Sequence, residues 1–388
     1  MHLPFTCGAV GYFSYDLKNF TEELPDNAID DLNMPDCILG FYDTAVVYDN
    51  LNRTAYVASS GFPELGGSFR NRRRRAERLE EFKSRLLTSA GSPEGPVVTS
   101  GLPVSSNFSK SSYIEAIQKA KLYIKRGDIY QVNLSQQFVT ELRGEPFDLY
   151  MRLRRYSPAP FSSYLDFKDI VIASSSPERF LLKRDSYIET RPIKGTRPRG
   201  KDDIHDLMLE RELISSRKDH AEHIMIVDLE RNDLGRICEY GSVRLSEPVV
   251  LEKYANVFHL VSTVSGKLRK GLDQVDCLLA AFPGGSITGA PKIRSMEIID
   301  ELEGVKRSVY TGAIGYLSFS GDMDTSIVIR TFIIKDRAVY FQVGGGIVAD
   351  SDPEKEYEET LDKAKGLMQA LGAVSRPGSR RRGELVTV

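Results

Sequence analysis

The sequence predicts an α+β fold, because segments with strand patterns follow one another in groups instead of alternating singly with helices. Residues 8–60 are rich in aromatic residues and valine, and residues 311–348 read as a β-meander. Helical patterns stand between these groups, and the longest covers residues 203–235. A doubly wound sheet would need strict alternation of single strands and helices. This sequence lacks that alternation, so it favours α+β.

The totals describe an ordinary globular chain. At 388 residues it could form one large domain or two smaller ones, and its hydrophobic content of 41% and net charge of -2 are unremarkable. This charge gives no reason to expect a nucleic acid or a membrane as partner, and no apolar run reaches the roughly 18 residues of a spanning helix. The cysteines, at positions 7, 37, 238 and 277, are too scattered for a disulfide framework or a metal site, so we expect a cytoplasmic protein with reduced thiols.

The first third of the chain is expected to pass from strands to helix. Residues 68–88 have an amphipathic helical pattern with a very basic start, and the Ser-, Gly- and Pro-rich residues 88–106 indicate a linker. Ser112 and Glu115 then have the spacing of a capping box, which predicts a helix that ends near Gly127. Residues 130–136 follow as a strand with polar residues on one face.

The rest of the chain is expected to be strands and helices in mixed runs. The predicted strands cover 161–190 and 237–268, and the predicted helices cover 203–235, 273–282, the stretch after the loop 284–292 to about Leu302, and about 353–371. We therefore predict an N-terminal region 1–106, a second domain 107–372, and a disordered basic tail 373–388.

Residues 191–200 hold two prolines, two glycines, three arginines and one lysine. This composition excludes a helix and makes a central strand unfavourable, so we expect a shaped loop that presents cations. Lys194 is the one amine in the loop that could act as a nucleophile. The alternative interpretation of the loop alone is a solvated basic turn.

Charged residues on two predicted helices suggest an oxygen-ligand metal site. His220 and His223 are three apart, whereas the zinc signature needs histidines four apart, so Mg²⁺ with carboxylate ligands is the better prediction. On the last helix, Glu356, Glu359 and Lys363 fall within about 60° of one another on one face. They suit a metal and an anionic substrate, or a solvated face with salt bridges.

Three further features could contact an anion. The glycine-rich loop 284–292 fails the Walker A test, because Gly289 is followed by Ala and Pro, but backbone amides before a helix can bind a carboxylate. Residues 344–346 are three glycines, which allow close backbone approach or a tight turn. Arg330 lies within an apolar strand pattern and should have an anionic partner. The arginine runs 72–75 and 380–382 read as a solvated helix face and a tail.

Together these stretches resemble the chorismate-utilising enzymes, a family that includes anthranilate synthase component I, aminodeoxychorismate synthase component I, and the isochorismate and salicylate synthases. The resemblance covers the chain from Gly8 to about Leu371. It rests on motifs at 131–135, 176–179, 192–200, 219–233, 282–292, 310–316 and 344–359. It implies large layered antiparallel β-sheets flanked by helices.

Two positions resemble one branch of this family. Pro-Ile-Lys-Gly-Thr around Lys194 is the form of aminodeoxychorismate synthase component I, whereas anthranilate synthases usually carry Ala at Lys194. Gln131 stands where the water-using members have a lysine base, which favours ammonia. The resemblance thus implies conversion of chorismate to 4-amino-4-deoxychorismate for p-aminobenzoate and folate synthesis, with ammonia from a separate glutamine amidotransferase subunit. Anthranilate synthase component I is the nearest alternative, and a non-catalytic anion- or nucleic-acid-binding protein is a remote one.

The resemblance also implies a role for each matched residue. Lys194 would attack C2 of chorismate, Glu178 would protonate the departing 4-hydroxyl, and His259 would orient or assist. Gln131 and Thr196 would complete the catalytic set. Mg²⁺ would be held by Glu222 and Glu359 with Glu356 nearby. Substrate contacts would come from Arg330, Tyr310, Thr288, Gly289, Gly344, Gly345, Gly346 and Lys363.

The chain departs from the family at its start. The family normally has a further N-terminal segment that contributes strands and part of a tryptophan pocket. Here the resemblance begins almost at once, at Gly8, so it implies a shortened start and leaves tryptophan binding open.

Overall fold

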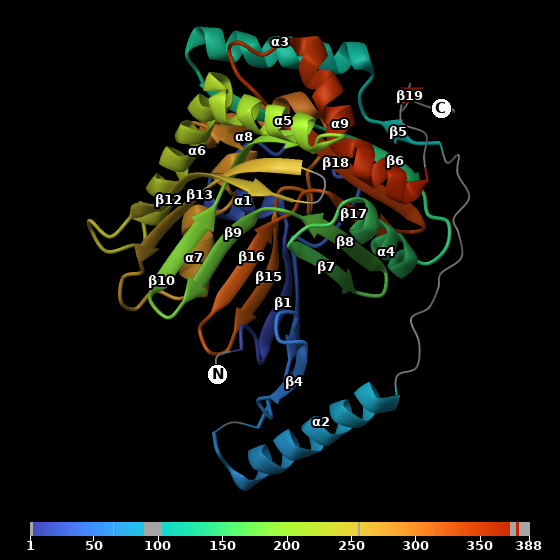
Figure 1. Cartoon of the computed structure of the whole chain (residues 1–388), viewed down its shortest axis with the longest axis vertical. Helices are drawn as coiled ribbons and strands as arrows, with labels where there is room; N and C mark the ends of the chain where they lie inside the picture. The colour runs from blue at the N-terminus through green and yellow to red at the C-terminus, as the bar shows by residue number, and fades with distance from the viewer. Residues whose placement is uncertain (1–2, 65, 89–102, 255–256, 373–377, 380–388) are drawn as a thin grey trace.

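A computed structural model describes residues 3–64, 66–88, 103–254, 257–372 and 378–379. Figure 1 shows two large sheets in the body of the molecule, with α3, α5, α6, α8 and α9 gathered at one end of them. Apart from one short parallel pair, the sheets are antiparallel. The α+β prediction is therefore confirmed.

The larger sheet has nine strands in the described part of the chain, in the order β11-β13-β10-β9-β16-β15-β1-β2, with β12 also paired to β13. Its strands are β1 (Gly8–Phe13), β2 (Cys37–Tyr42), β9 (Arg179–Arg184), β10 (Tyr187–Arg191), β11 (Ile193–Pro198), β12 (Arg244–Lys253), β13 (Val257–Lys267), β15 (Ala313–Ser318) and β16 (Met323–Ile327). Because β1 pairs with β15, residues from both predicted regions of the chain share this sheet.

The second sheet has eight described strands, in the order β19-β5-β6-β18-β17-β8-β7, with β14 paired to β6. Its strands are β5 (Ser105–Ser106), β6 (Gln131–Glu141), β7 (Phe161–Asp166), β8 (Ile170–Ser176), β14 (Gly289–Ala290), β17 (Thr331–Lys335), β18 (Ala338–Ile347) and β19 (Gly378–Ser379). The pair β6–β18 sets Gly344 against Ser135 and Gly346 against Asn133. This register decides which side chains meet in the site.

The helices begin and end at recognisable signals. They are α1 (Lys18–Thr21), α2 (Phe69–Thr88), α3 (Lys110–Arg126), α4 (Pro146–Tyr156), α5 (Asp203–Ser215), α6 (Arg217–Gly235), α7 (Gln274–Ala281), α8 (Lys292–Glu303) and α9 (Pro353–Leu371), with short 3-10 turns η1 (Tyr15–Leu17) and η2 (Gly285–Ile287). Asp273 and Asp352 cap α7 and α9 through their carboxylates. Gly127 and Gly372 end α3 and α9 in the left-handed conformation, as helix C-termini commonly do.

The loop predicted at 191–200 is wrong in part, because its centre is the strand β11. This strand lies at the edge of the sheet, where Pro198 is tolerated. Its register against β13 shifts between Ile193 and Thr196, and Gly195 in this gap has φ of +83°. A bulge of this kind redirects a side chain, and the residue beside the glycine is Lys194.

Other boundaries differ from the sequence prediction. Helix α3 starts at Lys110, because Ser109 is its cap and Ser112 is the reciprocal partner in the capping box. The predicted helix 203–235 is two helices that meet at Ser216, whose side chain caps α6. The predicted meander 311–348 changes sheet between β16 and β17, so Arg330 lies in this connection, with φ of +51°, and not within a strand.

The apolar interior follows these layers. Phe138, Phe332 and Phe341 of the eight-stranded sheet pack together under α4 and α9, where Leu153 and Leu367 complete the cluster. Burial of each side chain of this size stabilises the folded state by about 1.5–3 kcal/mol. This packing fixes α9 against β18, the strand of the three glycines.

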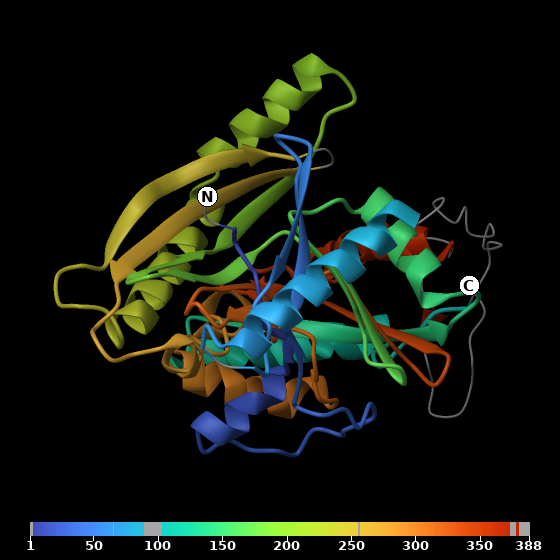
Figure 2. The ribbon, with the colours of Figure 1, turned by 90° about the horizontal axis from the view of Figure 1, so that it is seen from below.

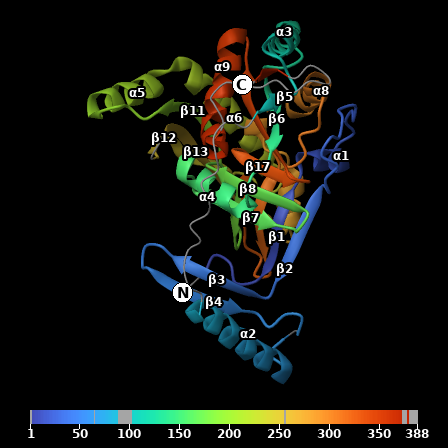
Figure 3. The ribbon, with the colours of Figure 1, turned by 90° about the vertical axis from the view of Figure 1, so that its right-hand side faces the viewer.

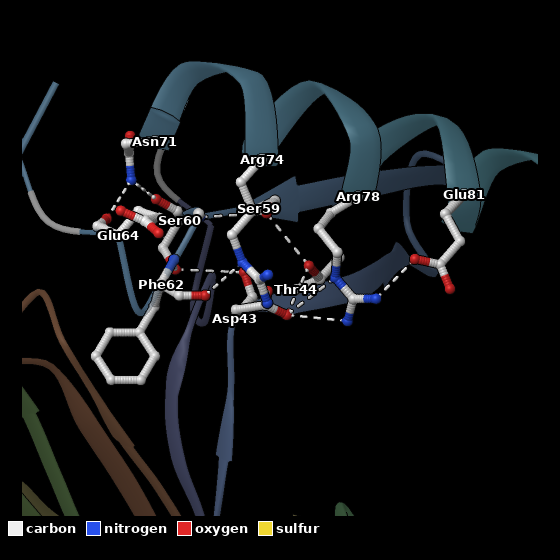
Figure 4. A network of polar contacts seen from close by, with 11 residues as sticks. Asp43, Thr44, Ser59, Ser60, Phe62, Glu64, Asn71, Arg74, Arg78 and Glu81 are labelled. Atoms are coloured by element: carbon white, nitrogen blue, oxygen red, sulfur yellow. Dashed lines mark hydrogen bonds and ion pairs between the residues drawn. The ribbon is translucent and has the colours of Figure 1, made fainter. Parts of the chain in front are cut away.

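The hairpin β3 (Thr44–Asp49) and β4 (Thr54–Ser59) and the helix α2 stand away from the body of the molecule (Figure 3). Asp43 holds this unit together by accepting from Arg74 and Arg78 at 3.0 Å (Figure 4). Asn71 adds a hydrogen bond to the carbonyl of Ser60. Some arginines of α2 therefore form local ion pairs, in addition to the solvated helix face that the sequence predicted.

Two sequence predictions lie largely outside the described residues. The linker 88–106 is described only at Thr88 and from residue 103, and the tail 373–388 only at Gly378–Ser379, which pair with β5. Within the described ranges, none of the helices combines the length and apolarity needed to cross a membrane.

Candidate active site

Residues from both sheets and two helices meet at the end of β18, beside α6 and α9. Figure 2 shows the molecule from below the view of Figure 1. A Cβ atom built on Gly346 would lie 2.2 Å from Nε2 of Gln131 and 3.7 Å from Nζ of Lys194. One built on Gly345 would lie 3.5 Å from a carboxylate oxygen of Glu356 and 3.8 Å from one of Glu359. Position 346 therefore needs a glycine where the Gln131 amide approaches, whereas a Cβ atom at position 345 would make only ordinary contacts.

Lys194 projects from the bulge of β11 into this region. Burial lowers the pKa of its amine, and the nearby Lys363 ammonium lowers it further, while Glu222, Glu178 and Glu359 oppose the shift. A lowered pKa makes the neutral, nucleophilic amine accessible closer to neutral pH. The predicted nucleophile is thus placed in an environment that suits nucleophilic attack.

Glu178 lies between β8 and β9 with its carboxyl buried. The hydroxyl of Ser286 donates to it at 2.6 Å, and the backbone N–H of Ile193, next to Lys194, donates at 3.5 Å. Burial raises its pKa, although the bond from Ser286 and the charges of Lys194 and Arg330 act in the opposite direction. A carboxyl group with a raised pKa keeps its proton to higher pH, which suits a general acid.

His259 of β13 lies directly across from Thr196 of β11, and the Thr196 hydroxyl is 2.8 Å from its Nδ1. Burial and the positive charge of Arg330 lower its pKa to about 3, so the ring is neutral at physiological pH. Its Nε2 is buried and has no hydrogen-bond partner among the residues that the structure describes. Thr196 therefore fixes the orientation of the His259 ring, and Nε2 of the ring can form a hydrogen bond that orients a neighbouring group.

Arg330 lies in the turn between the two sheets, at a backbone angle that non-glycine residues rarely adopt. Burial lowers its pKa, and the carboxyl group of Glu178 partly restores it. A partly buried guanidinium here offers a bidentate donor for a carboxylate ligand.

The carboxylates predicted to hold a metal lie on α6 and α9 among lysines. Lys218 is 3.8 Å from Glu222 and 3.5 Å from Glu356, and Lys363 is 2.8 Å from Glu359. Burial raises the pKa of Glu222, whereas the Lys363 ammonium lowers that of Glu359. Among the described residues, no three His, Cys, Asp or Glu side chains are grouped closely enough to hold a metal ion by themselves.

Four predicted substrate contacts are used within the protein. The Thr288 hydroxyl donates to the carbonyl of Gly284 at 3.0 Å, and Gly289 pairs with Val132 of β6. Tyr310 is buried, and the Arg307 guanidinium lies 5.8 Å from the centroid of its ring. Lys363 donates to the carbonyl of Gly344 at 2.9 Å. Lys363 thus lies beside the glycines of β18, while Thr288, Gly289 and Tyr310 are engaged in contacts within the protein.

Sequence reasoning missed several residues that support the site. Arg307 is fully buried, donates to Glu303 at 2.6 Å and to the carbonyl of Asn133 at 2.8 Å, and so ties the end of α8 to β6. Glu230 accepts from the backbone of Gly285 at 3.1 Å, beside Ser286. Glu303 and Arg307 are four residues apart, a spacing that can indicate an ion pair. Nothing in the sequence indicated that this pair would be buried.

Comparisons with known proteins identify the family of this chain. A family model described as chorismate binding enzyme matches residues 2–369. The chain is 43% identical to anthranilate synthase component 1 of Aquifex aeolicus, with 95% of this chain and 74% of that protein covered. It is also 43% identical to aminodeoxychorismate synthase component 1 of Klebsiella aerogenes, with 95% and 78% covered.

Solved structures show the same fold. Anthranilate synthase component I of Streptococcus pneumoniae superposes with a TM-score of 0.85 at 36% identity, covering 94% of this chain and 81% of that one. The Escherichia coli isochorismate synthase MenF superposes with a TM-score of 0.70 at 21% identity, covering 94% and 78%.

The chain therefore belongs to the chorismate-binding enzymes, as its motifs indicated. Within this family its relatives include anthranilate synthases and aminodeoxychorismate synthases at the same level of identity, so the comparisons define a chorismate-utilising enzyme and leave its product open.

Proposed function

We propose that this protein is the chorismate-aminating component of an aminodeoxychorismate synthase, which forms 4-amino-4-deoxychorismate from chorismate and ammonia. The observation that supports this proposal is the position of Lys194. Its amine lies within the site, near the amide of Gln131, and its pKa is lowered. The Glu178 carboxyl, with a raised pKa, lies beside the same strand.

In the first step, the neutral amine of Lys194 attacks C2 of chorismate. Both ring double bonds shift by one position, and the C4–O bond breaks. Glu178 supplies the proton, so that the oxygen leaves as water and the lysine nitrogen becomes a secondary ammonium. Hydroxide is a poor leaving group, and an acid with a raised pKa is what this step requires.

In the second step, ammonia attacks C4. Both double bonds shift back, the bond between C2 and the lysine nitrogen breaks, and Lys194 leaves as a neutral amine. The product carries an ammonium group at C4, and its release of one proton restores Glu178. The overall reaction consumes chorismate and ammonia and yields the aminated product and water.

Chorismate is a dianion, and the remaining predicted residues suit its carboxylates. Arg330 and Lys363 would bind and orient them. The carboxylate oxygens of Glu222, Glu359 and Glu356 fit Mg²⁺, which takes one or two protein carboxylates together with waters and substrate oxygens. When bound, Mg²⁺ would neutralise the ring carboxylate. Without it, Lys218 and Lys363 are the cations beside Glu356 and Glu359.

The ammonia is proposed to come from a separate glutamine amidotransferase subunit, because the relatives are named as component 1 of their synthases. The second candidate is anthranilate synthase component I. It is favoured by relatives of that name at 43% identity, and it would use the same ammonia but aminate C2.

Intact-protein mass spectrometry tests the role of Lys194. Enzyme mixed with chorismate and Mg²⁺ but no ammonium salt should accumulate an adduct with the mass of chorismate less water, located on the peptide that contains Lys194. The Lys194→Ala variant should show no adduct. An unmodified wild-type enzyme that still aminates chorismate at C4 would contradict the covalent step.

A further inference from the structure

The short turn η2 carries the hydroxyl that contacts the proposed acid. Ser286 in this turn donates to Oε1 of Glu178 at 2.6 Å, and both side chains are buried. Such a bond weakens steeply when its angle departs from linear, so it depends on how the backbone of η2 is held. Arg307 fixes the end of the turn by donating to the carbonyl of Ile287 at 2.9 Å. The start of the turn needs a second anchor.

Glu230 near the end of α6 supplies this second anchor. Its Oε1 accepts from the backbone N–H of Gly285, the residue directly before Ser286, at 3.1 Å. A Cβ atom on Gly285 would lie 2.6 Å from the Leu229 side chain and 3.2 Å from Oε1 of Glu230. The turn therefore rests directly on α6, and the backbone that leads into Ser286 is bound to one carboxyl group.

Glu230 is a buried acid that the proposed chemistry does not use, with 2% of its surface exposed. Burial and the nearby Asp233 carboxylate raise the pKa of Glu230, and Glu178 adds to the shift. Lys292 opposes it, but this ammonium pairs directly with Asp233 at 2.6 Å. A protonated carboxyl keeps an acceptor oxygen, so Oε1 can hold Gly285 in either protonation state.

We propose that Glu230 is a positioning residue for the general acid, because it holds η2 where Ser286 can donate to Glu178. Glu230 acts through the backbone of Gly285 and not on the substrate. The inference rests on the proposed function only in taking Glu178 as the acid that protonates the departing 4-hydroxyl. Both amination products require the loss of that hydroxyl.

Positioning and charge predict opposite signs for the effect of Glu230. Without the Glu230 acceptor the turn can shift, and a Ser286 hydroxyl that no longer reaches Glu178 lets the pKa of Glu178 rise. Loss of a negative charge near Glu178 would instead lower its pKa. Lys194 and Arg330 also face Glu178, and their charges stay in place in every variant below.

The test is the pH profile of kcat/KM for chorismate at saturating ammonia. Glu178 acts when protonated, so the rate falls as pH rises through its pKa. Glu230→Met removes the acceptor at similar volume and should move this alkaline limb to higher pH by about one pH unit. Glu230→Leu takes its place if the methionine variant does not fold. Glu230→Gln keeps an acceptor oxygen and should keep the wild-type limb.

Two further variants locate the effect. Ser286→Ala removes the group through which Glu230 acts, so adding Glu230→Met to Ser286→Ala should move the limb no further. Thr190→Val is the matched control, because the Thr190 hydroxyl lies 3.4 Å from Oε2 of Glu230, the oxygen that does not hold Gly285. It should keep the wild-type limb, and a shift equal to that of Glu230→Met would contradict the role of the Gly285 bond.

The other outcomes separate this inference from the proposed function. A limb that stays in place or moves to lower pH in Glu230→Met would overturn the positioning role, and so would an equal shift with and without the Ser286 hydroxyl. Persistence of the limb in Glu178→Gln would overturn the acid assignment and this inference together. Anthranilate as the wild-type product would overturn the 4-amino assignment and leave the comparison of pH profiles intact.

Discussion

At the scale of single residues, the protonation state of Glu178 decides whether the proposed chemistry is possible. Its carboxyl is buried, which favours the protonated form, while Ser286 donates to it at 2.6 Å and favours the ionised form. Lys194 has the opposite requirement, and burial favours its neutral form. Burial therefore shifts the pKa of the acid and that of the nucleophile in the direction that each needs.

Removing the Ser286 hydroxyl should raise the pKa of Glu178 further, because a bond to the charged form is lost. Glu178 acts when protonated, so the alkaline limb of the pH–rate profile should move to higher pH in Ser286→Ala, by about one to two units for a bond of this kind. Ser286→Thr keeps the hydroxyl and should keep the wild-type limb. A limb that does not move in Ser286→Ala would show that this hydrogen bond does not tune the acid.

At the scale of elements, the sequence predicted what local signals specify. The helices with caps and periodicity, α7 and α9, lie where they were expected, and so do the strands of the C-terminal meander. The strand β11 was missed because its prolines and glycines normally exclude a strand, and only the edge position and the bulge accommodate them. The helix α4 had no prediction, although it packs against α9.

The site was predictable to the extent that its residues form motifs. Lys194, Gln131 and the glycines at 344–346 were predicted and lie together. Ser286 and Asn133 were not singled out, because their roles depend on which strands and turns meet: Ser286 reaches Glu178 from a segment 108 residues away. Arg330 lies outside a strand because the chain changes sheet after β16. No local sequence pattern predicts this change of sheet.

The pair Glu303–Arg307 is the element-scale contact with the clearest energetic consequence. Glu303→Gln would leave the buried Arg307 guanidinium without its counter-charge, which should lower the free energy of unfolding by about 3–5 kcal/mol. The matched control is Glu297→Gln on the same helix, whose ion pair with Arg294 is partly exposed, with side chains 31% and 39% accessible, and should cost under about 1 kcal/mol. Urea unfolding of the two variants measures both values. Equal losses would contradict the structural role given to Glu303.

At the scale of the whole molecule, the two sheets supply different parts of the site. The nine-stranded sheet carries Lys194 and His259, and the eight-stranded sheet carries Gln131 and the glycines of β18. The helices α6 and α9 add the carboxylates. The hairpin β3–β4 and α2 lie apart from this assembly, as Figure 3 shows. The chemistry therefore depends on how the sheets and the two helices are held together.

Product analysis of the purified protein with chorismate, Mg²⁺ and an ammonium salt tests the central claim most directly. The account predicts 4-amino-4-deoxychorismate, detected as p-aminobenzoate that forms only when aminodeoxychorismate lyase is added. Anthranilate, formed without the lyase, would contradict the assignment of Lys194 to C4 amination and would place the protein with the anthranilate synthases of its family.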